Sequence, residues 1–245
     1  MKHIQPVPNK VSAIEKALQY ARDNGEPVIV GDIPKQVRLI CFDMDATLIR
    51  METINEIASA ATIGKQMEEL TLRAMRGEDD FRTSFLKRVE MLRGVPVSTL
   101  NEIASNMPYA KGLPHLMEEL QHRGIETAVI TGNFSIFGEY LKKSFNFNHI
   151  YTTVAGVGNG ALTGTICGSI IDAPAKSSIL LKICSEKNIP LSCTIAVGDG
   201  ANDIPMLSTA AAAIAYNAIS AKVGLDEVIL LLLYCLISLL GFCIL

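Results

Sequence analysis

The chain has 245 residues, a net charge of −3 and 49% hydrophobic residues, a length that fits one large domain or two small ones. Its apolar fraction is sufficient for a packed core and excludes a largely disordered chain. We find no basic run of the kind that nucleic-acid binding requires, and aromatic residues are only 6%, with no tryptophan, which argues against a stacking platform for single strands. We therefore expect a globular protein without a nucleic-acid partner.

The six cysteines form neither a CxxC pair nor a zinc-finger pattern with histidine. Most lie among Ile, Val and Leu, where a free cysteine behaves as a small buried hydrophobic residue. This usage favours a reducing compartment. The polar start of the chain, MKHIQPVPNK, shows no apolar signal-peptide core, so we expect a cytoplasmic protein.

The first ten residues are polar and are expected to be loose, and the pattern from Ser12 to Glu15 predicts a capping box for a helix that ends at Gly25. Residues 37–42 (VRLICF) predict a strand that is buried on both faces.

Residues 53–107 differ from the rest because they are polar, helical in pattern and without strands. Thr53 to Glu56 again fits a capping box, and a helical stripe ends at Gly77. A second helix can begin at the pair Asp79–Asp80 and run to Gly94. The block therefore predicts a helical insertion.

From Pro114 onward helices and strands alternate. The predicted helices are 114–122, 135–144, 174–187 and one that begins near Pro205; the predicted strands are 127–130 and 194–197, with a hairpin of 150–157 and 161–170. This alternation indicates an α/β fold, a mostly parallel sheet covered on both faces, in which ligands bind beyond the carboxyl ends of the strands.

The last 18 residues, 228–245, carry no charge. One interpretation is a buried strand over 228–232 followed by a short buried helix. The other is a membrane anchor, because 18 apolar residues are the short edge of a transmembrane span. No Lys or Arg follows the run and Gly241 interrupts it, so we favour the buried interpretation and leave membrane association open.

Acidic and small residues follow three of the predicted strands. Strand 37–42 is followed by Asp43 and Asp45, strand 127–130 by the segment Thr131–Asn133, and strand 194–197 by Asp199 and Asp203. Four carboxylates at one sheet edge repel one another unless a cation lies between them. Oxygen ligands select a hard metal, and a site that shares a substrate phosphate suits Mg²⁺.

Three further side chains bear on the ligand of this site, and two of them suit an anion. Lys176 lies in the first turn of its predicted helix, where a cation opposes the helix dipole unless an anion binds nearby. Arg88 falls within an apolar stripe, where a guanidinium can grip a carboxylate or phosphate, although a stem that packs and a head that reaches solvent is the alternative. Glu52 is tethered near the Asp43 cluster at the entrance to the insertion.

The segments FDMDATL, VITGNF, Lys176 and VGDGANDIPML together resemble the four motifs of the haloacid dehalogenase superfamily of phosphohydrolases. Within it, ETINEIA, AMRGEDDF and LKRVEMLRG resemble the phosphoserine phosphatase family. The resemblance spans roughly residues 37–225. It implies a Rossmann-like parallel core over 37–52 and 110–245 with a β-hairpin, a small helical cap over 53–109, and a helical segment over 1–36 outside the family's usual core.

The resemblance also implies a Mg²⁺-dependent hydrolysis of O-phosphoserine to serine and phosphate, the last step of serine biosynthesis. Asp43 would be the nucleophile that forms an aspartyl-phosphate, and Asp45 would be the general acid and then the base. Asp43, the Asp45 carbonyl, Asp199 and Asp203 would hold Mg²⁺. The substrate-binding residues would be Glu52 for the ammonium and Arg88 for the carboxylate, with Phe81, Thr131, Gly132, Lys176 and Asn202.

Asn133 departs from the family, which usually has Gly there, and so adds a side chain close to the substrate. The alternative is the same chemistry on another small phosphometabolite, as a phosphatase or a phosphotransferase, with membrane association through the C-terminal run. The sequence leaves a homodimer open.

Overall fold

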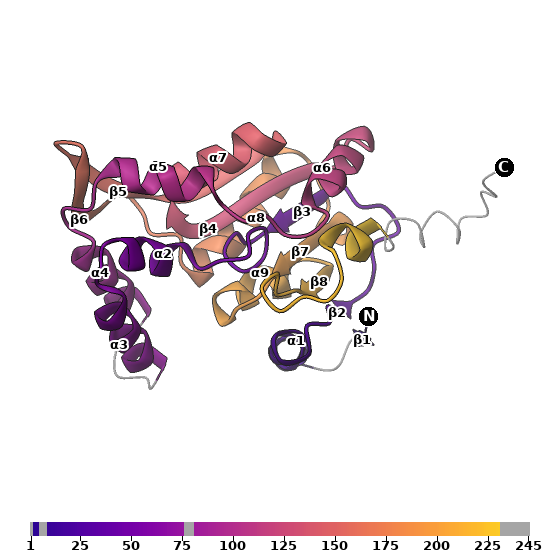
Figure 1. Ribbon diagram of the computed structural model, residues 1–245. Coiled ribbons are helices and arrows are strands. Elements are labelled where there is room, and N and C mark those ends of the chain that lie inside the picture. Colours follow the sequence, from indigo (N-terminus) through magenta and orange to yellow (C-terminus); the bar gives the residue numbers. More distant parts are fainter. Residues whose placement is uncertain (1, 5–8, 76–80, 231–245) are drawn as a thin grey trace.

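The computed structural model describes residues 2–4, 9–75 and 81–230 (Figure 1). Among them, eight strands form one sheet in the order β1-β2-β8-β7-β3-β4-β5-β6. The strands are β1 (Lys2–Ile4), β2 (Val28–Gly31), β3 (Leu39–Phe42), β4 (Glu126–Phe134), β5 (His149–Gly158), β6 (Ala161–Cys167), β7 (Thr194–Gly198) and β8 (Ala212–Ala215). The five central strands, from β8 to β5, are mutually parallel, whereas β2 and β6 run antiparallel to their inner neighbours. The predicted α/β fold with a mostly parallel sheet is confirmed.

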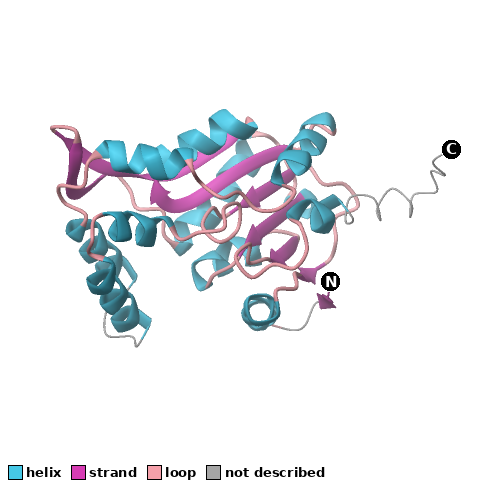
Figure 2. Ribbon diagram, viewed as in Figure 1, coloured by secondary structure: helices cyan, strands magenta, loops and turns pink. Residues whose placement is uncertain are grey.

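Helices cover both faces of this sheet (Figure 2). The helices α1 (Lys10–Asn24), α8 (Ala173–Glu186) and α9 (Ile204–Thr209) share one apolar core with one set of strand side chains. The helices α6 (Leu113–His122) and α7 (Ser135–Phe145) belong to the core on the opposite face. The central strands are therefore buried on both sides, which explains their continuous apolar sequences.

The N-terminal segment contributes more than the predicted helix. Residues 2–4 form β1 instead of a loose end, and β2 pairs with β8 at the sheet edge. Helix α1 begins after Asn9, whose side chain accepts from the Ser12 backbone N–H, so the predicted capping box at Ser12 is wrong. Both side chains are of types that cap helices, and the sequence alone did not decide between them. The predicted end at Gly25 is confirmed, where φ is +65°.

The helical insertion contains α2 (Thr53–Ala60), α3 (Gly64–Met75), α4 (Phe81–Met91) and α5 (Val97–Ser105), and the structure shows no strand in its described residues, 53–75 and 81–109. Helices α3 and α4 extend away from the sheet in Figure 1. The predicted helix end at Gly77 and start at Asp79–Asp80 lie outside the described residues.

Backbone hydrogen bonds tie this insertion to the tip of the β5–β6 hairpin. Gly94 N–H donates to the Leu162 carbonyl at 2.8 Å, Leu162 N–H to Val95 at 2.9 Å, and Val97 N–H to Gly160 at 2.9 Å. At its other end the insertion joins the core beside a bridge between Ile49 and Tyr109.

The C-terminal part of the described chain differs from expectation. Strand β8 was not predicted, because an alanine-rich run lacks the β-branched residues that mark strands. Residues 225–230 are helical, so the strand predicted over 228–232 is wrong for 228–230. Val228, Ile229 and Leu230 are nevertheless buried, as we expected, and residues 231–245 lie outside the described part. Over the residues that the structure describes, we find no helix with the length and apolar character to cross a membrane.

Candidate active site

Three carboxylates converge at the carboxyl ends of the central strands. Asp43 follows β3, Asp199 follows β7, and Asp203 ends the short helix η2 (Ala201–Asp203). One oxygen from each lies within 4.8 Å of the others. Asp43 and Asp203 are buried, and the Asp199 side chain keeps 12% exposure. The neighbouring strands β3 and β7 end at the same sheet edge, which is why residues so far apart in sequence meet.

Lys176 of α8 lies inside this cluster. Its Nζ donates to Asp43 Oδ1 at 2.5 Å and to Asp203 Oδ1 at 2.6 Å, and the side chain is buried. Burial disfavours the ammonium, but the charges of Asp203 and Asp43 outweigh that effect and raise the pKa of Lys176. The lysine is thus held charged at the sheet edge, and its predicted contact with a phosphate stays a prediction.

One lysine does not neutralise three acids. Burial, followed by the charge of Asp203, raises the pKa of Asp43 to about 7 in spite of Lys176. Burial and the charges of Asp203 and Asp43 raise the pKa of Asp199 to about 8. Such carboxylates gain from a nearby cation, and their all-oxygen donor set fits a hard divalent ion. The Asp45 carbonyl as a further ligand stays a prediction.

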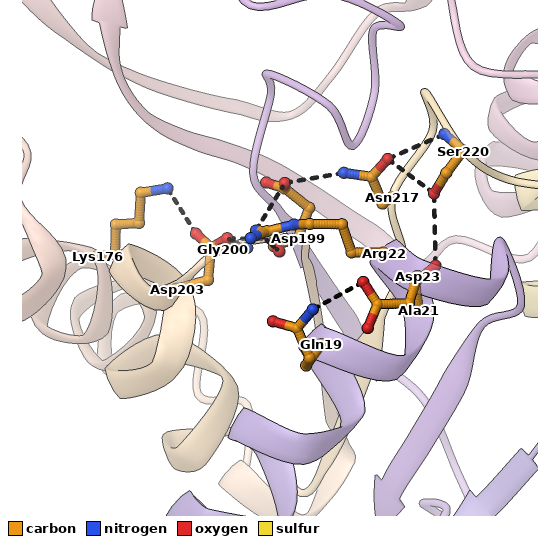
Figure 3. A network of polar contacts seen from close by, with 10 residues as sticks. All are labelled: Gln19, Ala21, Arg22, Asp23, Lys176, Asp199, Gly200, Asp203, Asn217 and Ser220. Atoms are coloured by element: carbon orange, nitrogen blue, oxygen red, sulfur yellow. Dashed lines mark hydrogen bonds and ion pairs between the residues drawn. The ribbon is translucent and has the colours of Figure 1, made fainter. Parts of the chain in front are cut away.

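Asp203 holds the loop that carries Asp199 through hydrogen bonds to its backbone. Asp203 Oδ2 accepts from the backbone N–H groups of Asp199 at 3.1 Å and Gly200 at 3.0 Å. A Cβ at Gly198 would lie 2.6 Å from the Asp203 carboxyl carbon, so only glycine permits this approach. The Asn217 amide donates to Asp199 Oδ2 at 3.1 Å (Figure 3).

Asp45 lies beside this cluster and receives three hydrogen bonds on one oxygen. The donors to Asp45 Oδ2 are the Thr53 N–H at 3.1 Å, the Thr53 hydroxyl at 2.9 Å and the Asn133 amide at 2.7 Å. Burial and the charges of Glu52 and Asp43 nevertheless raise the pKa of Asp45 well above its usual range. A carboxyl that is positioned and easily protonated suits a general acid–base role.

The predicted capping box at Thr53 is wrong. Glu52 is the N-cap residue of α2 and makes no side-chain cap bond, and the Thr53 hydroxyl points to Asp45 instead. The hydroxyl bonds the half-buried Asp45 carboxyl group rather than the helix N-terminus. Thr53 therefore positions Asp45, a function that its local sequence pattern did not reveal.

Thr131 and Gly132 lie within β4, which continues past the predicted strand end at 130 to Phe134. Thr131 is buried, and its hydroxyl accepts from the Asn133 N–H at 3.2 Å. A Cβ at Gly132 would lie 2.9 Å from the Ile171 carbonyl oxygen, so the backbone here needs glycine. Asn202 lies in η2 next to Asp203 and is partly buried.

Arg88 of the insertion and Glu52 at its entrance interact electrostatically. Arg88 of α4 is partly buried: burial lowers its pKa, and the charge of Glu52 pulls the pKa back up. Its Nε is buried and has no hydrogen-bond partner among the described residues. Glu52 is exposed to solvent, yet the surrounding protein desolvates its carboxylate and raises its pKa, against the pull of Arg22 and Arg88. Phe81 begins α4, and its side chain lies outside the described part.

Sequence reasoning missed two residues that contact the cluster, Asn217 and Arg22. Arg22 of α1 donates to the Asp199 carbonyl oxygen at 2.9 Å. Neither lies in a motif, and only the tertiary packing brings them to Asp199.

The comparisons with known proteins agree with this geometry. The sequence pattern of the haloacid dehalogenase-like hydrolases matches residues 37–211, and the chain belongs to that family. Its relatives include a phosphoserine phosphatase of Archaeoglobus fulgidus, 40% identical over 184 residues, or 75% of this chain and 54% of that protein. A phosphoserine phosphatase of Idiomarina loihiensis is 41% identical over 180 residues, or 74% of this chain and 82% of that protein. The chain is thus a member of the phosphoserine phosphatase family, although it spans only about half the length of the first of these relatives.

The fold has solved counterparts as well. The crystal structure of a probable phosphoserine phosphatase from Vibrio cholerae, in an unliganded form, superposes with a TM-score of 0.72 at 30% identity. The match covers 86% of this chain and 69% of that one.

Proposed function

We propose that this chain is a Mg²⁺-dependent phosphatase that hydrolyses O-phosphoserine to serine and phosphate, the last step of serine biosynthesis. The observation that carries the proposal is the buried group of Asp43, Lys176 and Asp203, in which Lys176 bonds both acids at the sheet edge. Phosphoryl transfer needs an in-line nucleophile and neutralisation of the phosphoryl oxygens, and little other covalent help. Asp43 supplies the first of these and Lys176 contributes to the second.

In the first step Asp43 attacks phosphorus, and the bond from phosphorus to the serine oxygen breaks. Asp45 gives its proton to that departing oxygen, so serine leaves as the neutral alcohol and Asp43 carries the phosphoryl group. In the second step Asp45 takes a proton from a water that attacks the aspartyl-phosphate. Phosphate leaves and both acids return to their starting states.

Asp43, Asp199 and Asp203 would hold the Mg²⁺, together with the Asp45 carbonyl. A bound Mg²⁺ neutralises the phosphoryl oxygens and keeps the attacking carboxylate ionised. Thr131, Gly132, Lys176 and Asn202 would bind the phosphoryl group.

The substrate class follows from Glu52 and Arg88. A carboxylate and a guanidinium beside a phosphate site complement the ammonium and carboxylate of an amino acid. The unpartnered Arg88 Nε supports this assignment, because a buried guanidinium donor is satisfied by an anion that a ligand brings. Phe81 would cover the amino-acid part. We propose the residues 53–109 as the cap and 37–52 with 110–245 as the catalytic core.

A screen of phosphate release tests the proposal, with O-phosphoserine, O-phosphothreonine and small sugar phosphates as substrates. We expect the highest kcat/KM for O-phosphoserine, loss of activity with EDTA and recovery with Mg²⁺. Equal turnover of sugar phosphates, or full activity in a verified metal-free preparation, would contradict it. Comparing free phosphate with phosphorylated acceptor separates hydrolysis from phosphotransfer, which the relatives do not favour.

We place this activity in the cytoplasm. The cysteines at 41, 167, 184 and 193 are free, which suits a reducing compartment. The homodimer remains a prediction that sedimentation of the full chain would test.

A further inference from the structure

Helix α1 precedes the family match at 37–211, yet it reaches the acidic cluster. Arg22 lies in its last turn, and its Nη2 donates to the Asp199 carbonyl oxygen at 2.9 Å (Figure 3). The same nitrogen lies 3.8 Å from Asp199 Oδ2. An arginine from outside the matched core thus contacts one of the three candidate metal ligands.

A second connection joins the end of α1 to the same carboxylate. The Ser220 hydroxyl lies 3.4 Å from the Ala21 carbonyl oxygen and 3.1 Å from Asn217 Oδ1. Asn217 Oδ1 also accepts from the Ser220 N–H at 3.0 Å, and the Asn217 amide donates to Asp199 Oδ2 at 3.1 Å. Arg22 therefore holds the backbone of Asp199 while Asn217 holds its carboxylate, and both are attached to one helix end.

The two contacts of Arg22 have opposite consequences for a metal. Its charge near Asp199 Oδ2 competes with a cation for that oxygen. Its hydrogen bond to the carbonyl fixes the loop after β7, which orients Asp199 for coordination. Arg22 is 48% exposed, so water and salt screen the charge effect, whereas the hydrogen bond keeps its geometry.

We propose that Arg22 is a positioning residue for metal binding: it holds the Asp199 loop in the conformation that coordinates Mg²⁺. The proposal rests on the function proposed above. Removal of Arg22 frees the Asp199 peptide on the side opposite Asp203, so part of the binding free energy must then be used to order it. We expect Mg²⁺ to bind about fivefold more weakly, as for the loss of one hydrogen bond.

The test compares Arg22→Met with Arg38→Met in the full chain. Arg38 is a matched control, because it is also an exposed arginine that donates to a backbone carbonyl, that of Asn188 at 3.1 Å. It lies just before β3, at the strand end opposite the acids. Mg²⁺ binding is measured directly by isothermal titration calorimetry, and the melting temperature of each metal-free variant is measured alongside.

We expect the roughly fivefold loss of Mg²⁺ affinity for Arg22→Met only, with kcat regained at saturating Mg²⁺. Unchanged Mg²⁺ affinity would overturn the proposal, as would tighter binding, which would mean that charge competition dominates. A loss of affinity equal to that of Arg38→Met would show a general effect of surface arginines and overturn it as well. If the unaltered chain itself bound no Mg²⁺, the proposed function would fail instead.

Discussion

Truncation of Arg88 is the sharpest test of how the substrate is selected. The substitution Arg88→Ala removes a guanidinium whose Nε is buried without a hydrogen-bond partner among the described residues. If that group binds the substrate carboxylate, the loss appears with O-phosphoserine. It does not appear with an aryl phosphate, which has no carboxylate to bind.

The size of the effect follows from burial. Truncating one member of a desolvated charge pair costs about 2–5 kcal/mol. Arg88 is only partly buried, so the lower end applies, and about 2 kcal/mol corresponds to roughly a 30-fold loss of kcat/KM.

The assay measures kcat/KM for O-phosphoserine and for p-nitrophenyl phosphate in the unaltered chain and the variant. The variant Arg82→Ala is the control, because Arg82 lies on the same helix and is exposed. Parallel losses on both substrates together with a lower melting temperature would refute the reasoning, since they are what a purely structural role for Arg88 in the cap produces.

Three further predictions concern the acids. Asp43→Asn should abolish phosphate release while the far-UV circular dichroism stays unchanged, because the amide is not a nucleophile; turnover above a few per cent, with deamidation excluded, would contradict this. Thr53→Val removes the hydroxyl bonded to Asp45 and should lower kcat about tenfold with little change in KM, since a hydrogen bond to the acid–base carboxyl contributes about 1.4 kcal/mol; a raised KM with unchanged kcat would point to substrate binding instead. The third concerns pH. The raised pKa values of Asp43, about 7, and Asp199, about 8, favour the protonated folded state, so their contribution to stability is lost as pH rises from about 4 to 8 in the metal-free protein. Mg²⁺ binds the ionised carboxylates and should therefore raise the melting temperature more at about pH 8.5 than at about pH 6; an equal shift at both pH values would be inconsistent with these pKa values.

The sequence predicted the acidic cluster because Asp43 and Asp199 directly follow apolar strands of a parallel sheet and Asp203 comes four residues after Asp199. Such strands end at the same edge, so Asp43, Asp199 and Asp203 could be brought together without any knowledge of the tertiary structure. Lys176 was singled out by a different signal, a positive charge in the first turn of a helix, where it opposes the helix dipole.

Other features depend on packing that local sequence does not encode. Thr53 fits a capping box, but the half-buried Asp45 carboxyl group competes for its hydroxyl. Residues 228–230 are apolar without periodicity, so strand and helix could not be told apart there. Arg22 lies 177 positions from Asp199, and nothing in its neighbourhood marks it.

The backbone ladder between residues 94–97 and the hairpin tip has a mechanical consequence. The insertion is joined to the core beside the Ile49–Tyr109 bridge, where the chain enters and leaves, and also through the hairpin, because β5 pairs with β4. Helix α5 packs against α7 of the core as well. A displacement of the insertion as a rigid unit therefore has to deform the hairpin, whose ladder is already interrupted between Ala155 and Val157. Any such displacement is transmitted through the hairpin to the main sheet itself, and not only to the two chain crossings.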